Sequence, residues 1–163
     1  MSEIVSKIKY AMSLRTPQEE ALSYLDAISS HCDYKKDSKD VVEVAASEYC
    51  EKQRKVKAGF EFPSFCYAMA TGIGKTRLMG ASIYYLYKTK GYKHFFILAP
   101  GNTIYDKLRK ESNPNHPKYI FKGLEAEMGR PKVYDGENYD TYPVKFEQMS
   151  LRVETVSYTH LRA

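Results

Sequence analysis

The chain has little cysteine and no tryptophan. Its 163 residues include three cysteines, and no two of them stand in the C-x-x-C spacing of a zinc or redox site. This scarcity excludes a disulfide framework, so we expect reduced thiols. The four histidines show no metal-ligand spacing either.

Long apolar runs and strong charge are missing as well. No stretch approaches the roughly 20 residues of a membrane-spanning helix, and the first eleven residues lack the apolar core of a secretory signal. We therefore expect a cytoplasmic protein. The net charge of +5 is mild and permits nucleic-acid binding without requiring it. The length suffices for one domain with a core.

Seven consecutive residues, A-T-G-I-G-K-T at 70–76, carry the strongest chemical signal of the chain. A strand is expected within 63–70 before them and a helix at 77–90 after them, with Gly91 as its C-cap. This order of a strand, a glycine-bearing turn and a helix is typical of a loop that binds the phosphates of a nucleoside triphosphate. Glycines let consecutive N–H groups point into one concavity, and the helix start adds the positive end of its dipole.

Two side chains of this segment have expected catalytic roles. Lys75 would place its ammonium on the β- and γ-phosphates, and the Thr76 hydroxyl would bind a bridging Mg²⁺ ion. The general pattern G-x-x-x-x-G-K-[ST] has glycine where this chain has Met69. The alternative is a lysine and a threonine that follow two glycines at a helix start by chance, but the flanking strand and helix favour phosphate binding.

The hydrophobic pattern around the loop predicts an α/β layered, mostly parallel sheet. Residues 1–15 are expected to be a short lead-in, and Ile104 and Leu108 are expected to face inward. The apolar run within 94–99 is typical of a strand buried on both faces. The other expected elements are a helix at 17–29 with Thr16 as N-cap, helices at 39–55 and 103–111, and weaker strands at 118–121 and 132–134.

Three blocks, in this order, resemble the N-terminal part of superfamily-two DEAD/DEAH-type helicases, and most of all the ATPase (Res) subunit of type III restriction enzymes. The blocks are L-R-T-P-Q-E-E-A-L at 14–22, M-A-T-G-I-G-K-T at 69–76 and F-I-L-A-P-G-N-T-I at 96–104. Met69 agrees with that family's phosphate loop, whereas Ile73 replaces a small polar residue.

This resemblance implies an incomplete three-layer RecA-like P-loop NTPase lobe with N-terminal helices. It divides the chain into an N-terminal helical segment with an adenine-contacting element (1–60), the first part of the ATP-binding lobe (61–150) and a tail expected to be non-native (151–163). It implies ATP and Mg²⁺ as cofactors, duplex DNA bound through its phosphate backbone, and a modification methyltransferase as a partner of the full-length system.

The resemblance also assigns site residues. Gln18 is the candidate for adenine selection, because a side-chain amide can match the donor at N6 and the acceptor at N7. A solvent-facing helix glutamine is the alternative, and Arg15 is a weaker candidate beside the nucleotide. The full set expected to bind the cofactor is Gln18, Thr71, Gly72, Ile73, Gly74, Lys75, Thr76 and Arg77.

In the third block, Pro100, Asn102 and Thr103 are expected to touch the nucleic-acid strand. Capping of the following helix is the alternative role of Asn102 and Thr103. Counter-charge nearby would come from Lys107, Arg109 and Lys110, for which a solvated helix face is the alternative.

Hydrolysis also needs a carboxylate pair that holds magnesium, D-E-x-H or D-E-C-H in this family, and no stretch of the chain matches it. Asp135, Glu137 and Asp140 follow no convincing apolar strand. We therefore expect the ATP-binding front part of a DNA helicase or translocase that is inactive alone. A stand-alone P-loop nucleotide-binding module and a small-metabolite kinase are the alternatives, and Gln18 ahead of the loop argues against the kinase.

Overall fold

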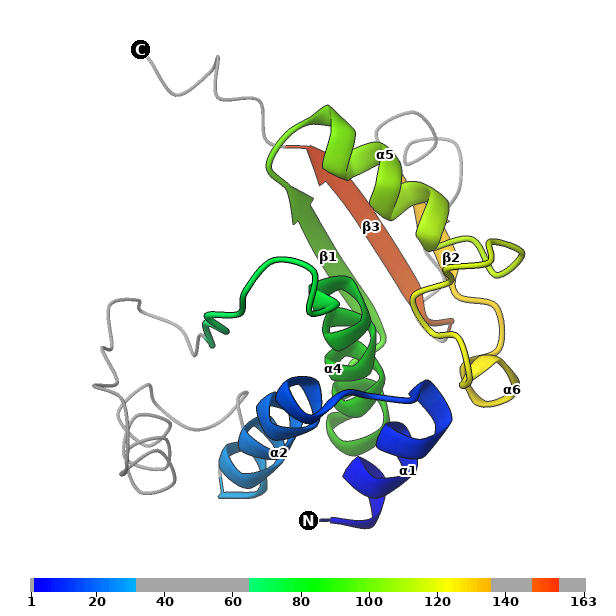
Figure 1. Ribbon diagram of the computed structural model, residues 1–163. Helices are drawn as coiled ribbons and strands as arrows, with labels where there is room; N and C mark the ends of the chain where they lie inside the picture. Colours follow the sequence, from blue (N-terminus) through cyan, green and yellow to red (C-terminus); the bar gives the residue numbers. More distant parts are fainter. Residues whose placement is uncertain (1, 32–64, 136–147, 156–163) are drawn as a thin grey trace.

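The computed structural model describes residues 2–31, 65–135 and 148–155 (Figure 1). The expected helix at 39–55 lies outside these residues. No helix within the described ranges is both long and apolar enough to cross a membrane. The elements, in chain order, are α1 (Glu3–Met12), α2 (Thr16–His31), α4 (Lys75–Lys90), β1 (His94–Ala99), α5 (Asn102–Glu111), α6 (Glu125–Met128), β2 (Lys132–Tyr134) and β3 (Ser150–Thr155).

The strands form a parallel sheet in the order β1-β3-β2, which confirms the expected α/β class. The last of the described strands, β3, is therefore central, and its register pairs Phe95 with Leu151 and Ile97 with Val153. Leu151 and Val153 are fully buried. The segment 151–155, expected from the sequence to belong to the tail, thus forms part of a strand, and alternate side chains of it enter the core. Residues 156–163 lie outside the described part.

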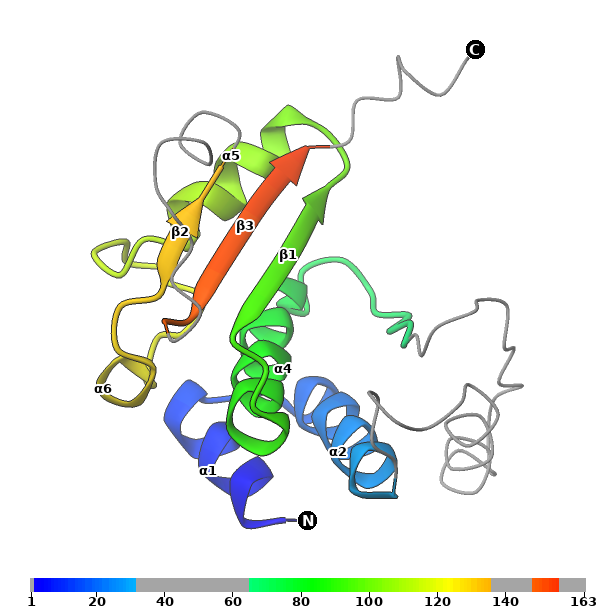
Figure 2. The ribbon, with the colours of Figure 1, turned by 180° about the vertical axis from the view of Figure 1, so that it is seen from behind.

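Helices cover one face of this sheet. Figures 1 and 2 show α4 and α5 on the same side, and no described helix lies over the other face. Ile97 and Ala99 point to the covered side and are buried, whereas Phe96 and Leu98 are 58% and 56% exposed. Within the described residues β1 is therefore buried on one face only, and the expected burial on both faces is wrong because no described helix packs against Phe96 and Leu98.

The N-terminal residues form a helix where only a lead-in was expected. The Ser2 side chain caps α1 by accepting a hydrogen bond from Val5 N, at 3.4 Å. Val5, Ile8 and Met12 fall on one helical face and are buried. This face packs in the common core beside α2 and α4, so the lead-in is a structural part of the fold.

Two expected strands are absent from the described ranges. Residues 118–121 form turns, although Tyr119, Ile120 and Phe121 are buried. Residues 65–70 pair with no described strand, although their burial alternates: Phe65, Tyr67 and Met69 are half-buried, and the residues between them are exposed. In both segments the apolar residues pack against the core without a neighbouring strand to complete a hydrogen-bonded ladder.

Helix α4 lies at the centre of the packing. A Cβ added at Gly80 would stand 2.2 Å from the carbonyl oxygen of Ile120, so only glycine lets the helix approach the 118–121 turn this closely. The helix ends at Gly91, which has the left-handed conformation expected of a C-cap (φ 68°). The helix begins at Lys75, two residues earlier than expected.

Candidate functional site

The segment 71–74 forms a turn that leads directly into α4. Gly72 and Gly74 have φ angles of 78° and 94°, in the left-handed region that glycine enters without strain. Gly74 is the N-cap of α4 and makes no side-chain capping hydrogen bond. The first turn of the helix can therefore donate to an anion, and its dipole adds typically about 0.3–1 kcal/mol for a charge placed there.

The early start of α4 puts both expected catalytic side chains in its first turn. Lys75 is exposed and Thr76 is half-buried. The Thr76 hydroxyl lies 3.5 Å from the ammonium of Lys107, which belongs to α5. Two lysines from different helices thus stand at the opening of the loop.

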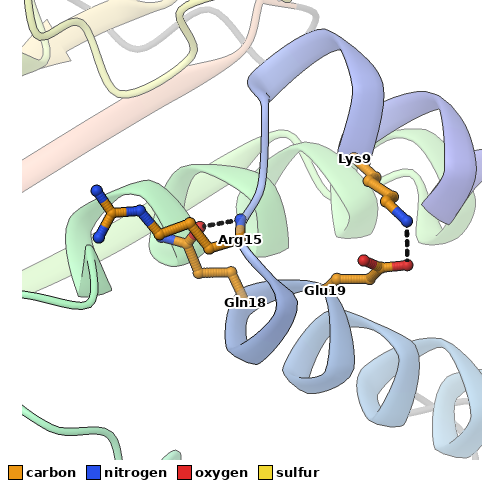
Figure 3. A network of polar contacts seen from close by, with 4 residues as sticks. All are labelled: Lys9, Arg15, Gln18 and Glu19. Atoms are coloured by element: carbon orange, nitrogen blue, oxygen red, sulfur yellow. Dashed lines mark hydrogen bonds and ion pairs between the residues drawn. The ribbon is translucent and has the colours of Figure 1, made fainter.

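Gln18 joins the N-terminal helices to the loop. Its Nε2 donates to the carbonyl oxygens of Ile73 and Gly74, both at 2.9 Å, across 55 residues of sequence or more. Its Oε1 accepts from the backbone N–H of Arg15 at 2.8 Å, which caps the start of α2 (Figure 3). The side chain is 2% exposed, so the solvent-facing alternative is wrong. The amide of Gln18 instead holds the loop and the helix start together.

A cavity of about 300 Å³ opens beside this contact. It lies between the α1–α2 junction and the loop, and Arg15 and Arg77 contribute its positive charge. The Arg77 guanidinium donates to the carbonyl oxygen of Met12, at the end of α1. The residues that line the cavity are Ser13, Arg15, Gln18, Gly72, Ile73, Gly74 and Arg77. The first and second sequence blocks are therefore brought together around one hollow.

An ion pair fixes the α1–α2 junction. Lys9 Nζ donates to Glu19 Oε1 at 2.7 Å, and Figure 3 shows this pair on the opposite side of the junction from the Arg15 guanidinium. The hydrogen bond to Glu19 raises the pKa of the Lys9 ammonium. Thr16, the expected N-cap, is instead the first residue of α2, and Glu19 in the same first turn pairs with Lys9 of α1.

The approach to the loop is apolar. Tyr67 is half-buried, and burial raises the pKa of its phenol to about 12, so it is neutral at physiological pH. With Phe65 and Met69 it packs against the core and anchors the segment that leads to the phosphate loop.

The third block lies at the carboxyl end of β1. Gly101 is the N-cap of α5, and no side chain caps that helix. Asn102 and Thr103 are exposed within the first turn, so the capping alternative does not describe them. Ile104 is 43% exposed, contrary to the expectation that it faces inward, whereas Leu108 is buried as expected. None of Pro100, Asn102 and Thr103 lines the cavity beside Gln18.

Asp135 directly follows β2 and is buried. Its Oδ2 lies 3.4 Å from Arg109 Nη1, and both residues line a second, open cavity of about 620 Å³ at the far end of α5. The described ranges contain no cluster of three or more side chains that could hold a metal ion. Glu137 and Asp140 lie outside the described residues.

A glycine turn that opens a helix beside a parallel sheet, with helices before it, defines the front of a RecA-like α/β lobe that is incomplete here. The family model described as type III restriction enzyme, res subunit, matches residues 11–160. The chain therefore belongs to the family of type III restriction enzyme Res subunits, which are helicase-like ATPases.

One curated relative is the probable type III restriction-modification enzyme HindVIP Res subunit of Haemophilus influenzae (strain ATCC 51907 / DSM 11121 / KW20 / Rd). It is 44% identical over 54 residues, which are 32% of this chain and 10% of that protein. The match thus spans only a tenth of the relative's length. No solved structure matches the chain.

Sequence reasoning missed two features of this site. The α1 helix was signalled by a Ser-Glu start and by apolar residues at positions 5, 8 and 12. The approach of Lys107 to Thr76 had no signal in the sequence, because it depends on how α5 packs across the sheet.

Proposed function

We propose that this chain is the ATP-binding front part of an ATP-dependent DNA helicase or translocase of the type III restriction family. The observation that carries the proposal is the loop at 71–74. It opens α4 on two left-handed glycines, leaves the helix start without a side-chain cap and borders a cavity lined by Gln18. Amides of that loop suit a phosphate chain, and the cavity suits the rest of a nucleotide.

The residues present fit ATP and Mg²⁺. A Cβ built on Gly72 would meet nothing within 4 Å, so the backbone there is open to a ligand. The exposed ammonium of Lys75 can neutralise the phosphates, and the Thr76 hydroxyl is an oxygen ligand of the kind that Mg²⁺ prefers. When bound, Mg²⁺ would offset the charge that develops on the phosphates during transfer.

Gln18 has two roles to reconcile. Its amide already holds Ile73 O, Gly74 O and Arg15 N, and it also lines the cavity. We propose that it selects adenine from this position while it fixes the loop. Replacement by alanine then lowers the affinity for ATP more than that for GTP. An equal loss for both nucleotides would leave Gln18 with the loop-holding role alone.

The third block would meet DNA. The exposed Asn102 and Thr103, with Pro100 before them, stand where backbone N–H groups of α5 begin, and such a helix start suits a DNA phosphate. The double variant Asn102→Asp/Thr103→Glu would weaken binding to duplex DNA, measured by fluorescence anisotropy at low salt. Unchanged affinity would remove this turn from the interface.

The full-length protein would contain further domains and would act with a partner subunit. We propose that the full-length protein works in the cytoplasm with a modification methyltransferase subunit and hydrolyses ATP to move along DNA. This chain alone lacks the D-E-x-H or D-E-C-H sequence. We therefore expect nucleotide binding without turnover, and DNA-stimulated phosphate release by the chain alone would contradict this.

Calorimetric titration with Mg-ATP tests the proposal. We expect saturable binding by the unaltered chain and none by Lys75→Ala, because the phosphates lose their positive partner at the helix start. Lys118→Ala is the matched control, since Lys118 is an exposed lysine that does not line the cavity beside Gln18. Equal binding by the Lys75 variant and the control would overturn the assignment of Lys75.

A further inference from the structure

Lys107 stands at the phosphate loop although it belongs to a different element. It is exposed on α5, where the sequence suggested a counter-charge for nucleic acid. Its ammonium lies 3.5 Å from the Thr76 hydroxyl, at the long end of hydrogen-bond range. The packing of α5 thus directs this cation to the mouth of the loop.

The position of this ammonium has a consequence for ligand binding. The Thr76 oxygen is the expected ligand of Mg²⁺, so a cation beside it must move when the metal arrives. A lysine ammonium sits on a flexible four-carbon stem and can shift by a few ångströms. The terminal phosphate of the same ligand would then offer it a negative charge close to the Mg²⁺ position.

We propose that Lys107 is a ligand of the terminal phosphate and that it makes the site discriminate nucleoside triphosphates from diphosphates. This inference rests on the proposed function. A diphosphate ends one group short of Lys107, whereas Lys75 and the loop amides still hold its phosphates. Lys75 therefore supports both ligands, and Lys107 supports only the longer one.

Titrations of the full chain with Mg-ATP and Mg-ADP test this inference. Lys107→Met keeps most of the apolar stem and removes the charge, so we expect the ratio of ATP to ADP affinity to fall about tenfold, the value of one charge-assisted hydrogen bond. Lys107→Arg should restore part of the ratio. Lys110→Met is the matched control, because Lys110 is an exposed lysine of the same helix that lines the distant 620 Å³ cavity.

The outcomes separate this inference from the proposed function. A lowered ratio in Lys107→Met with an unchanged ratio in Lys110→Met supports a contact to the terminal phosphate. An unchanged ratio, or an equal loss of ATP and ADP affinity, would refute that contact while leaving nucleotide binding intact. An unaltered chain that binds neither nucleotide would refute the proposed function, and the inference with it.

Discussion

Replacing Gly74 by alanine probes the contact between Gln18 and the loop most sharply. A Cβ at this position would stand 2.4 Å from Gln18 Nε2, and the residue has φ +94°. The left-handed conformation alone costs an alanine about 1–2 kcal/mol. Displacement of the amide breaks its bonds to Ile73 O and Gly74 O, each of which contributes about 1 kcal/mol. We expect a total loss of about 3–4 kcal/mol in the free energy of unfolding.

Gly72→Ala is the matched control. Gly72 also has a left-handed conformation, at φ +78°, but a Cβ there would meet nothing within 4 Å. We expect it to lose only the conformational part, about 1–2 kcal/mol. Urea denaturation followed by circular dichroism measures both variants.

A double-variant cycle isolates the side-chain contact. In a Gln18→Ala background no amide remains for the new Cβ to displace. The difference between Gly74→Ala and Gly72→Ala should therefore shrink from about 2 kcal/mol to under about 0.5 kcal/mol. A difference that persists without Gln18 would refute a stabilising contact between the Gln18 amide and the loop. Equal losses of stability for the two glycine variants in the presence of Gln18 would refute it as well.

Three further predictions concern stability and association. Burial raises the pKa of the Tyr85 and Tyr119 phenols to about 12 and raises that of Tyr84 as well. Because the pKa is higher in the folded state, these phenols contribute stability that is complete below pH 10 and is lost as the pH rises toward 12. Their phenolate absorbance at 295 nm should therefore appear together with the loss of helical circular dichroism. Complete titration of these tyrosines before unfolding would contradict this. Glu19→Ala should lower the midpoint of urea denaturation slightly through the lost Lys9 pair, whereas Glu20→Ala, a change at an exposed residue of the same helix, should leave the midpoint almost unchanged. Equal midpoints for the two variants would show that the pair contributes no stability. Leu98→Lys should reduce self-association, measured as the average mass in light scattering, because Phe96 and Leu98 expose apolar surface on an edge strand of the described sheet. An unchanged average mass would show that this surface does not cause self-association.

Local chemistry made part of this fold predictable from the sequence. The expected turn at 71–74 is confirmed because Gly72 and Gly74 can adopt the left-handed backbone conformation that this turn requires. The strand at 94–99, the C-cap at Gly91 and the second helix of the structure followed from periodicity and end signals. These features depend on residues close together in the chain.

The features that the sequence did not predict depend on distant partners. The strand 150–155 alternates apolar and charged residues, Leu151 and Val153 against Arg152 and Glu154, but its position between β1 and β2 is a matter of topology. The apolar run of β1 predicted a fully buried strand, although the described helices cover only one of its faces. Gln18 was expected to serve the ligand, and its contacts to loop carbonyls 55 residues away could not be read from helical spacing.

Hydrogen exchange of the loop amides, read by mass spectrometry with and without Mg-ATP, tests the central claim most directly. If the main chain at 71–77 holds the phosphates, exchange there slows when ligand is added, and the slowing disappears in Lys75→Ala. Protection elsewhere in the chain with an unchanged loop would contradict the account.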